Sequence, residues 1–94
     1  MIDTVEQWII EKYGNIDGFE LLQHNRYFRL NHCNTTVVAF EFELRSSYDL
    51  AVRVFANNPN NIFINFCDPL FFERVSEICD DRITDIRTRF MRRY

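Results

Sequence analysis

The sequence predicts an α+β fold, a two-layer α/β sandwich with an N-terminal helix and a C-terminal helix on one face of a five-stranded antiparallel meander sheet. Three observations predict it. The stretch 36–45 alternates between apolar and mixed residues, as a half-buried strand does. Short turns join five such stretches without changing which side is apolar. Apolar residues at helical spacing precede and follow the strands.

The first element is predicted to be an amphipathic helix that lies on the sheet. Asp3 and Thr4 each have capping-box spacing, so either can begin it, and Gly14 is a natural stop. The apolar residues of this segment fall on one stripe, consisting of Ile2, Val5, Ile9 and Tyr13. This stripe is the surface that we expect to face the strands.

The stretch from Thr36 to Arg45 defines the two faces of the predicted sheet. Its even-numbered apolar residues point to the inner side, namely Val38, Phe40, Phe42 and Leu44. Its odd-numbered residues point to the outer side, namely Val37, Ala39, Glu41, Glu43 and Arg45. The inner face should pack on the helices, and the outer face is where a functional surface is expected.

Odd and even positions of a strand face opposite sides of the sheet, and this side-chain parity predicts the lengths of the connections between strands. The predicted loops are 24–25, 33–35, 46–48 and 57–61. A two-residue loop at 33–34 would put Leu30 opposite outward Val37, so a three-residue loop is favoured there, with Asn34 at positive φ. The inner face then collects Phe19, Leu21, Phe28, Leu30, Val38, Phe40, Phe42, Leu44, Leu50, Val52, Val54, Ile62, Ile64 and Phe66. These loops also pair Leu21 with Phe28 and Val54 with Ile64.

A long amphipathic helix is predicted from Asp68-Pro69 to the C-terminus, with Asp68 as its cap. About 25 residues of helix would be about 37 Å long, whereas a strand of about seven residues spans only about 23 Å. The helix therefore either breaks near Asp80-Asp81 or projects past the sheet. A break would fold the last turns back onto the same chain. The favoured alternative is a homodimer in which two such helices meet, through Ile83, Ile86, Arg87, Arg89 and Phe90.

Length and composition predict one domain over residues 1–94. The chain carries a net charge of -3, and the last thirteen residues hold five of its ten arginines. Three cysteines at spacings of 34 and 12 fit neither a disulfide framework nor a Cys-x-x-Cys site. With no apolar run long enough for a membrane span and no signal-peptide pattern, the sequence predicts a cytoplasmic protein that does not bind membranes.

The outer face is the predicted site for binding a partner protein. Its residues mix apolar, aromatic and charged side chains, which is the composition of protein interfaces. The predicted partner-binding residues are Tyr27, Arg29, Val37, Ala39, Glu41, Arg53, Phe55 and Phe63. The same residues also fit ordinary cross-strand pairing on a solvated face, with Glu20–Arg29 and Glu41–Arg53 as ion pairs and Phe55–Phe63 as an aromatic pair.

The sequence offers no set of catalytic, metal or cofactor residues. His24 and His32 fall at opposite ends of one strand, and His32 and Cys33 are neighbours whose side chains should point apart. The two glycines, Gly14 and Gly18, are too few for a phosphate-binding loop. We therefore expect a protein that is not an enzyme, with no catalytic residue, no metal and no cofactor.

The expected function is a non-enzymatic protein-binding module that acts through the outer face. In architecture the chain looks like small intracellular inhibitors of bacterial or phage origin, such as immunity proteins that neutralise toxins or phage proteins that counter host defences. The expected partner is then a toxin, a nuclease or a host factor. The alternative is a single-stranded nucleic-acid-binding protein that uses the aromatic and arginine side chains of the sheet together with the arginine-rich C-terminal helix. The acidic body argues against this alternative.

Overall fold

The structure is a computed structural model that describes residues 2–56 and 62–91, without the side chains of residues 90 and 91. Its elements follow one another as α1 (Ile2–Tyr13), β1 (Phe19–His24), β2 (Tyr27–His32), β3 (Thr35–Ser46), β4 (Asp49–Phe55), β5 (Ile62–Asn65) and α2 (Phe71–Met91). The five strands form one open antiparallel sheet in the order β1-β2-β3-β4-β5. The predicted turn at 57–61 lies outside the described residues.

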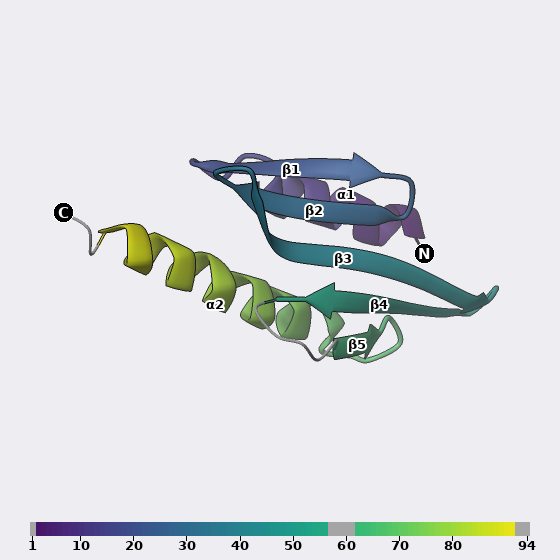
Figure 1. The fold of residues 1–94 in the computed structure, drawn as a ribbon. Coiled ribbons are helices and arrows are strands. Elements are labelled where there is room, and N and C mark those ends of the chain that lie inside the picture. Colours follow the sequence, from purple (N-terminus) through teal and green to yellow (C-terminus); the bar gives the residue numbers. More distant parts are fainter. Residues whose placement is uncertain (1, 57–61, 92–94) are drawn as a thin grey trace.

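The predicted α+β fold is confirmed, with both helices on the inner face of the sheet. Figure 1 shows α1 alongside β1 and β2, and α2 running along β3 to β5. One continuous core joins the two helices to the strands through Val5, Ile9, Tyr13, Phe28, Leu30, Val38, Phe40, Val52, Val54, Phe71, Val75 and Cys79. No helix of the described segments is long and apolar enough to cross a membrane.

The predicted register of the three central strands is confirmed where they cross the core. Phe28 lies opposite Phe40, Leu30 lies opposite Val38, and Phe40 lies opposite Val54. All of these side chains are buried. The parity argument works here because each of these strands must present its apolar side to the same helices.

The two connections predicted as three-residue loops are instead two-residue turns, each combined with a β-bulge. The chain turns at Cys33 and Asn34, both at positive φ, and Val37 is the extra residue of a bulge in β3. At the other end of β3 the chain turns at residues 47–48, and Arg45 is the extra residue. A bulge changes side-chain parity just as one more loop residue does, so parity alone could not tell the two solutions apart.

The registers of the two outer hairpins are shifted by two residues from the prediction. Leu21 lies opposite Leu30 and not Phe28, because the turn is formed by Asn25 and Arg26. Asn25 has a φ of 56°, a conformation that asparagine tolerates better than most residues. A shift of two residues keeps each side chain on its predicted face, so the inner set survives while the individual pairs change.

The shift in the last hairpin changes the neighbours of Phe63. Val54 lies opposite Ile62 and Arg53 lies opposite Phe63, whereas the prediction placed Phe55 there. The predicted Phe55–Phe63 aromatic pair is therefore wrong. An arginine and an aromatic ring face each other directly across the outer side of the sheet instead.

The helix ends agree in part with the predicted signals. α1 begins by Ile2, so Asp3 and Thr4 lie within its first turn, and it ends at Tyr13 just before Gly14. Asp68 is not the N-cap that was predicted, because the first helical hydrogen bond runs from the N–H of Arg74 to the carbonyl of Leu70. The Asp68 Oδ1 instead accepts a hydrogen bond from the backbone N–H of Leu70 at 2.9 Å in the turn before the helix. The residues after Asp68 form a tight turn, and α2 begins only at Phe71.

α2 is one continuous helix, with no break at Asp80-Asp81. Ile83 and Ile86 are only 5% and 7% exposed, because β3 has twelve residues and the helix starts later than predicted. The premise that these two side chains need a second subunit to cover them is therefore wrong. In Figure 1 the last turns of α2 extend past the ends of the strands. The side chain of Phe90 lies outside the described residues.

Candidate functional site: the outer face of the sheet

The structure brings most of the predicted partner-binding residues onto one open surface. Across the sheet, Tyr27 lies opposite Glu41, Glu41 opposite Arg53, and Arg53 opposite Phe63. Arg29, Ala39 and Phe55 form the neighbouring row. Both helices cover the other side, so no element of the described chain packs over these rows. Apart from Ala39, the residues of these two rows are what we call the outer face, namely Tyr27, Arg29, Glu41, Arg53, Phe55 and Phe63.

Val37 and Ala39 do not contribute to this surface as predicted. Val37 is the extra residue of the β3 bulge, which turns it into the core, where it is 5% exposed. Ala39 keeps its outward register but is 3% exposed, because a methyl group is easily covered by longer neighbours. The apolar part of the outer face is therefore carried by aromatic rings rather than by these two small side chains.

Arg53 and Phe63 form the centre of the accessible part. The Arg53 guanidinium lies 4.4 Å from the centroid of the Phe63 ring and 5.9 Å from that of Phe55. A second guanidinium, that of Arg45, lies 5.7 Å from the Phe63 ring. Contacts of this kind are worth about 0.5–1 kcal/mol at exposed sites and more where water is excluded. The Phe63 ring thus has two guanidinium groups close to it.

Burial and charge make this centre suited to contact another molecule. Phe63 is 43% exposed, a large fraction for an aromatic side chain. The Nε of Arg53 is buried without a hydrogen-bond partner in the described chain, although its guanidinium tip lies over the ring. An arginine stacked on an aromatic ring is rigid, so little side-chain entropy remains to be lost when a partner binds.

The predicted ion pairs of the outer face are not formed among the described residues. Glu20 lies opposite Asn31 because of the shifted register, and Glu41 lies opposite Arg53 without a salt bridge. Arg29 is exposed. The carboxylate of Glu41 and the guanidinium of Arg29 are therefore available to a partner.

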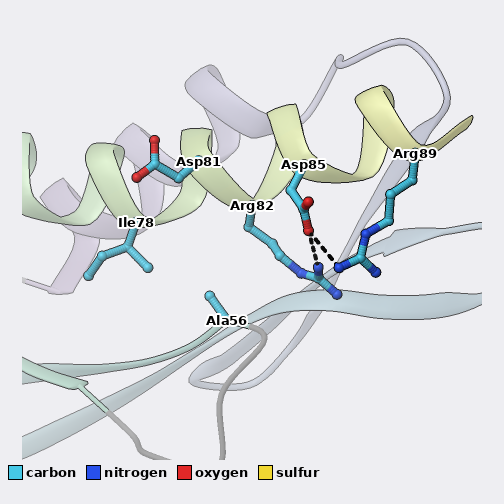
Figure 2. Close-up of a pocket in the computed structure, with 6 residues that line it drawn as sticks. All are labelled: Ala56, Ile78, Asp81, Arg82, Asp85 and Arg89. Atoms are coloured by element: carbon cyan, nitrogen blue, oxygen red, sulfur yellow. Dashed lines mark hydrogen bonds and ion pairs between the residues drawn. The ribbon is translucent and has the colours of Figure 1, made fainter. Parts of the chain in front are cut away.

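Arg82, Arg87 and Arg89, the described arginines in the second half of α2, make contacts within the chain. Figure 2 shows Arg82 and Arg89 converging on Asp85, whose Oδ2 lies 2.9 Å from Arg82 and 3.1 Å from Arg89. The Arg82 Nε also donates to the backbone oxygen of Val37 at 3.4 Å. Arg87 lies over Phe19, 5.8 Å from the ring centroid. These contacts tie α2 to the β3 bulge and to β1.

A hollow of about 370 Å³ beside these arginines is lined by Ala56, Ile78, Asp81, Arg82, Asp85 and Arg89. Its two carboxylates and two guanidinium groups are balanced in charge, and Asp85 already binds both arginines. The hollow therefore has no surplus of either charge to hold an ion. Its clearest role is structural, because the 14% exposed Arg82 side chain fastens α2 to the sheet.

A partly buried polar contact joins the two helices. The Tyr13 hydroxyl donates to Asp80 Oδ1 at 3.4 Å, and Lys12 Nζ lies 3.6 Å from Asp80 Oδ2. Burial raises the pKa of Tyr13 well above its usual range, and the neighbouring Cys79 and Asp80 raise it further. Burial likewise raises the pKa of Cys79 to about 12. Both groups are neutral at pH 7, so neither is activated as a nucleophile or a base.

The three cysteines are expected to differ sharply in reactivity. Cys33 and Cys67 are exposed, whereas Cys79 is fully buried with a raised pKa. An aromatic disulfide reagent should therefore titrate two thiols in the native protein and the third only after denaturation. Cys79→Ala should remove the third, slow thiol and leave the two fast ones. Equal rates for all three thiols in the native protein would contradict this burial.

The described segments contain no metal-binding site, because no three of their His, Cys, Asp or Glu side chains are close enough together to hold an ion. His32 packs against Phe19, with ring centroids 4.9 Å apart. His24 and His32 lie at the two ends of the β1–β2 hairpin, where His24 pairs with Tyr27 and His32 pairs with Phe19. The outer face thus remains the surface with the clearest binding chemistry.

The sequence reasoning missed two residues near this surface. The alternation placed Arg45 on the outer side of β3, but Arg45 was left out of the predicted partner-binding set although its guanidinium lies over the Phe63 ring. Tyr48, in the turn between β3 and β4, is 91% exposed and was treated only as a loop residue.

The comparisons with known protein families, curated proteins and solved structures found no match to this chain.

Proposed function

We propose that this protein is a non-enzymatic protein-binding module whose partner docks on the outer face. The observation that carries the proposal is the exposed Phe63 ring with the Arg53 and Arg45 guanidinium groups close to it, on a sheet face that neither helix covers. Aromatic and arginine side chains dominate the binding energy of protein interfaces when they lie at their centre. Tyr27 and Glu41, in the same row, add a polar rim.

The proposal extends to the kind of partner. A small domain that offers a rigid sheet face suits the inhibition or neutralisation of another protein in the cytoplasm, such as a toxin, a nuclease or a host factor. Both charge signs on the face, from Arg29 and Arg53 to Glu41, favour a folded partner with a mixed surface over a uniform polyanion.

Single-stranded nucleic acid is the second candidate, and it has less support. Arg82 and Arg89 are both bound to Asp85, so they are not arranged as a phosphate track. The outer face retains one feature that favours it, namely the Phe63 ring beside two guanidinium groups, on which a base could stack. Fluorescence anisotropy with mixed oligonucleotides at low salt tests this candidate, and binding that weakens steeply with salt would support it.

Site-specific crosslinking tests the docking of a protein on the outer face. A photoreactive phenylalanine analogue at position 27, replacing Tyr27 on β2, should form a discrete adduct with a host protein on illumination. The same analogue at the exposed Thr84 of α2 is the matched control and should form none. Phe55→Asp with Phe63→Asp should abolish the adduct while the circular dichroism spectrum stays unchanged. An adduct that survives this double variant, or that forms equally from position 84, would contradict the proposed site.

A further inference from the structure

The strand β5 ends the sheet and leaves one side of its backbone unpaired within the described chain. β5 has four residues and pairs with β4 alone. An open strand edge is a template for another strand, and natural proteins usually protect such edges with lysine, proline or a covering element. The residues of β5 are Ile62, Phe63, Ile64 and Asn65, which include neither lysine nor proline.

The hydrogen-bond pattern shows which backbone groups face the open edge. The N–H of Phe66 donates to the carbonyl of Leu50 at 2.8 Å, so these two residues are a hydrogen-bonded pair. Such pairs alternate along an antiparallel ladder, which means that Ile62 and Ile64 direct their backbone groups to β4 and that Phe63 and Asn65 direct theirs outward. The Asn65 carbonyl already accepts from Asp68 at 3.0 Å. Phe63 is left with both its N–H and its carbonyl at the edge.

A groove runs beside this edge, between β5 and the first half of α2. It encloses about 510 Å³ and is lined mainly by Ile62, Ile64, Leu70, Glu73, Glu77 and Ile78. Leu70 is 53% exposed and Ile62 is 41% exposed, so the floor of the groove is apolar and accessible. The groove lies on the inner side of the sheet, where every second side chain of an added strand would point.

The charge at the rim of the groove is negative. Glu73 and Glu77 are exposed, lie one helical turn apart and have no ion-pair partner among the described side chains. Among its described lining residues the groove has one cation, Arg74, which is bound to Asp68 at 3.2 Å. A second copy of the chain would bring two further glutamates against these two, which opposes a symmetric dimer at this edge.

We propose that β5 accepts an extended segment of a partner protein as a sixth strand of the sheet. The segment pairs with the backbone of Phe63 and places every second side chain into the groove. These side chains are apolar or are lysine and arginine, whose methylene stems cover Leu70 and Ile62 while their charged ends reach Glu73 and Glu77. This interaction goes beyond the proposed docking on the outer face, because here β5 binds an extended segment of the partner by hydrogen bonds to that segment's backbone.

A random-peptide phage library selected on the full chain tests the proposal. Selection on the wild-type protein, with removal of phage that bind Phe63→Pro, should enrich peptides that alternate apolar and basic residues. Proline at position 63 removes only an N–H that faces outward, which an edge strand tolerates. Phe63→Ala is the matched control, since it also loses the ring but keeps the N–H. An enriched peptide should bind Phe63→Pro about tenfold more weakly than Phe63→Ala.

Charge reversal gives the second arm of the experiment. Glu73→Lys with Glu77→Lys should shift the enriched peptides from basic to acidic residues. Asp3→Lys with Asp17→Lys makes the same change in net charge on and after α1, and it should leave the selected sequences basic. Amide shifts on adding an enriched peptide should be confined to residues 62–78 in NMR spectra.

Three results would overturn the edge proposal. One is a selection that yields no peptide able to distinguish wild type from Phe63→Pro, and another is a set of enriched peptides that shift the amides of Tyr27 and Phe55 instead. Sedimentation could also show a dimer of the free protein that Leu70→Asp dissociates, which would make a second copy the occupant. None of these results contradicts docking on the outer face, which the crosslink from position 27 tests separately, so failure of this proposal and failure of the outer-face proposal are distinguishable.

Discussion

The protein with Ile86→Asp is expected to be largely unfolded at neutral pH. Ile86 is buried in the core that α2 shares with the sheet. The change removes a large apolar side chain, which costs about 2–5 kcal/mol, and leaves a carboxylate that must be desolvated or protonated. A domain of this size has a total stability of about 5–10 kcal/mol. Urea unfolding followed by Trp8 fluorescence measures the loss.

The matched control is Thr84→Asp, which puts the same carboxylate on the exposed side of the same helix. It should change the free energy of unfolding by less than about 1 kcal/mol, as exposed substitutions usually do. If Ile86 served a subunit contact instead, Ile86→Asp would dissociate a dimer into folded monomers. A folded, monomeric Ile86→Asp protein with wild-type stability would contradict the burial seen here.

The free energy of unfolding is expected to fall steeply as the pH rises above about 9. Cys79 has a pKa of about 12 in the folded protein against an ordinary value of 9.0. Between these values the unfolded chain has released a proton that the native protein keeps, so the native state loses stability with each pH unit. Tyr13, whose pKa burial also raises, acts in the same direction from its ordinary value of 10.0 upward. Below pH 9 neither group contributes a pH dependence.

The size of this effect is about 1.4 kcal/mol per pH unit for each group ionised only in the unfolded chain. Urea unfolding at a series of pH values between neutral and strongly alkaline measures it. Tyr13→Phe with Cys79→Ala should flatten the curve, although the loss of the Tyr13 hydroxyl bond to Asp80 lowers stability at neutral pH. A wild-type curve that runs parallel to that of the double variant would contradict the prediction.

The sequence was a good guide to which face of the sheet each residue occupies. It was a weaker guide to which residue lies opposite on the neighbouring strand. Leu21 and Ile64 both lie on the predicted inner side, yet each pairs two residues away from the predicted position. Burial distinguishes the two faces by several kcal/mol per strand, because a one-residue slip would expose every apolar side chain. A two-residue slip costs far less free energy, because every side chain stays on its face. The conformation of the turn, at residues such as Asn25, then decides which of these registers forms.

The centre of the candidate site illustrates the same division. The outward direction of Arg53 and Phe63 followed from alternation alone. Their stacking depends on the register of β5, which the sequence placed two residues away. Val37 was predicted on the outer face because nothing local to it reveals the bulge that turns it into the core.

The sequence by itself determined the α+β class, the inner side of every strand and the two flanking helices, since these follow from the period of apolar residues. Only the tertiary structure decided that α2 runs unbroken over Ile83 and Ile86, because that depends on the full length of β3 beneath it. It alone also decided the open edge at Phe63 and the acidic groove beside it. Such features arise where distant segments meet, and local periodicity carries no information about those contacts.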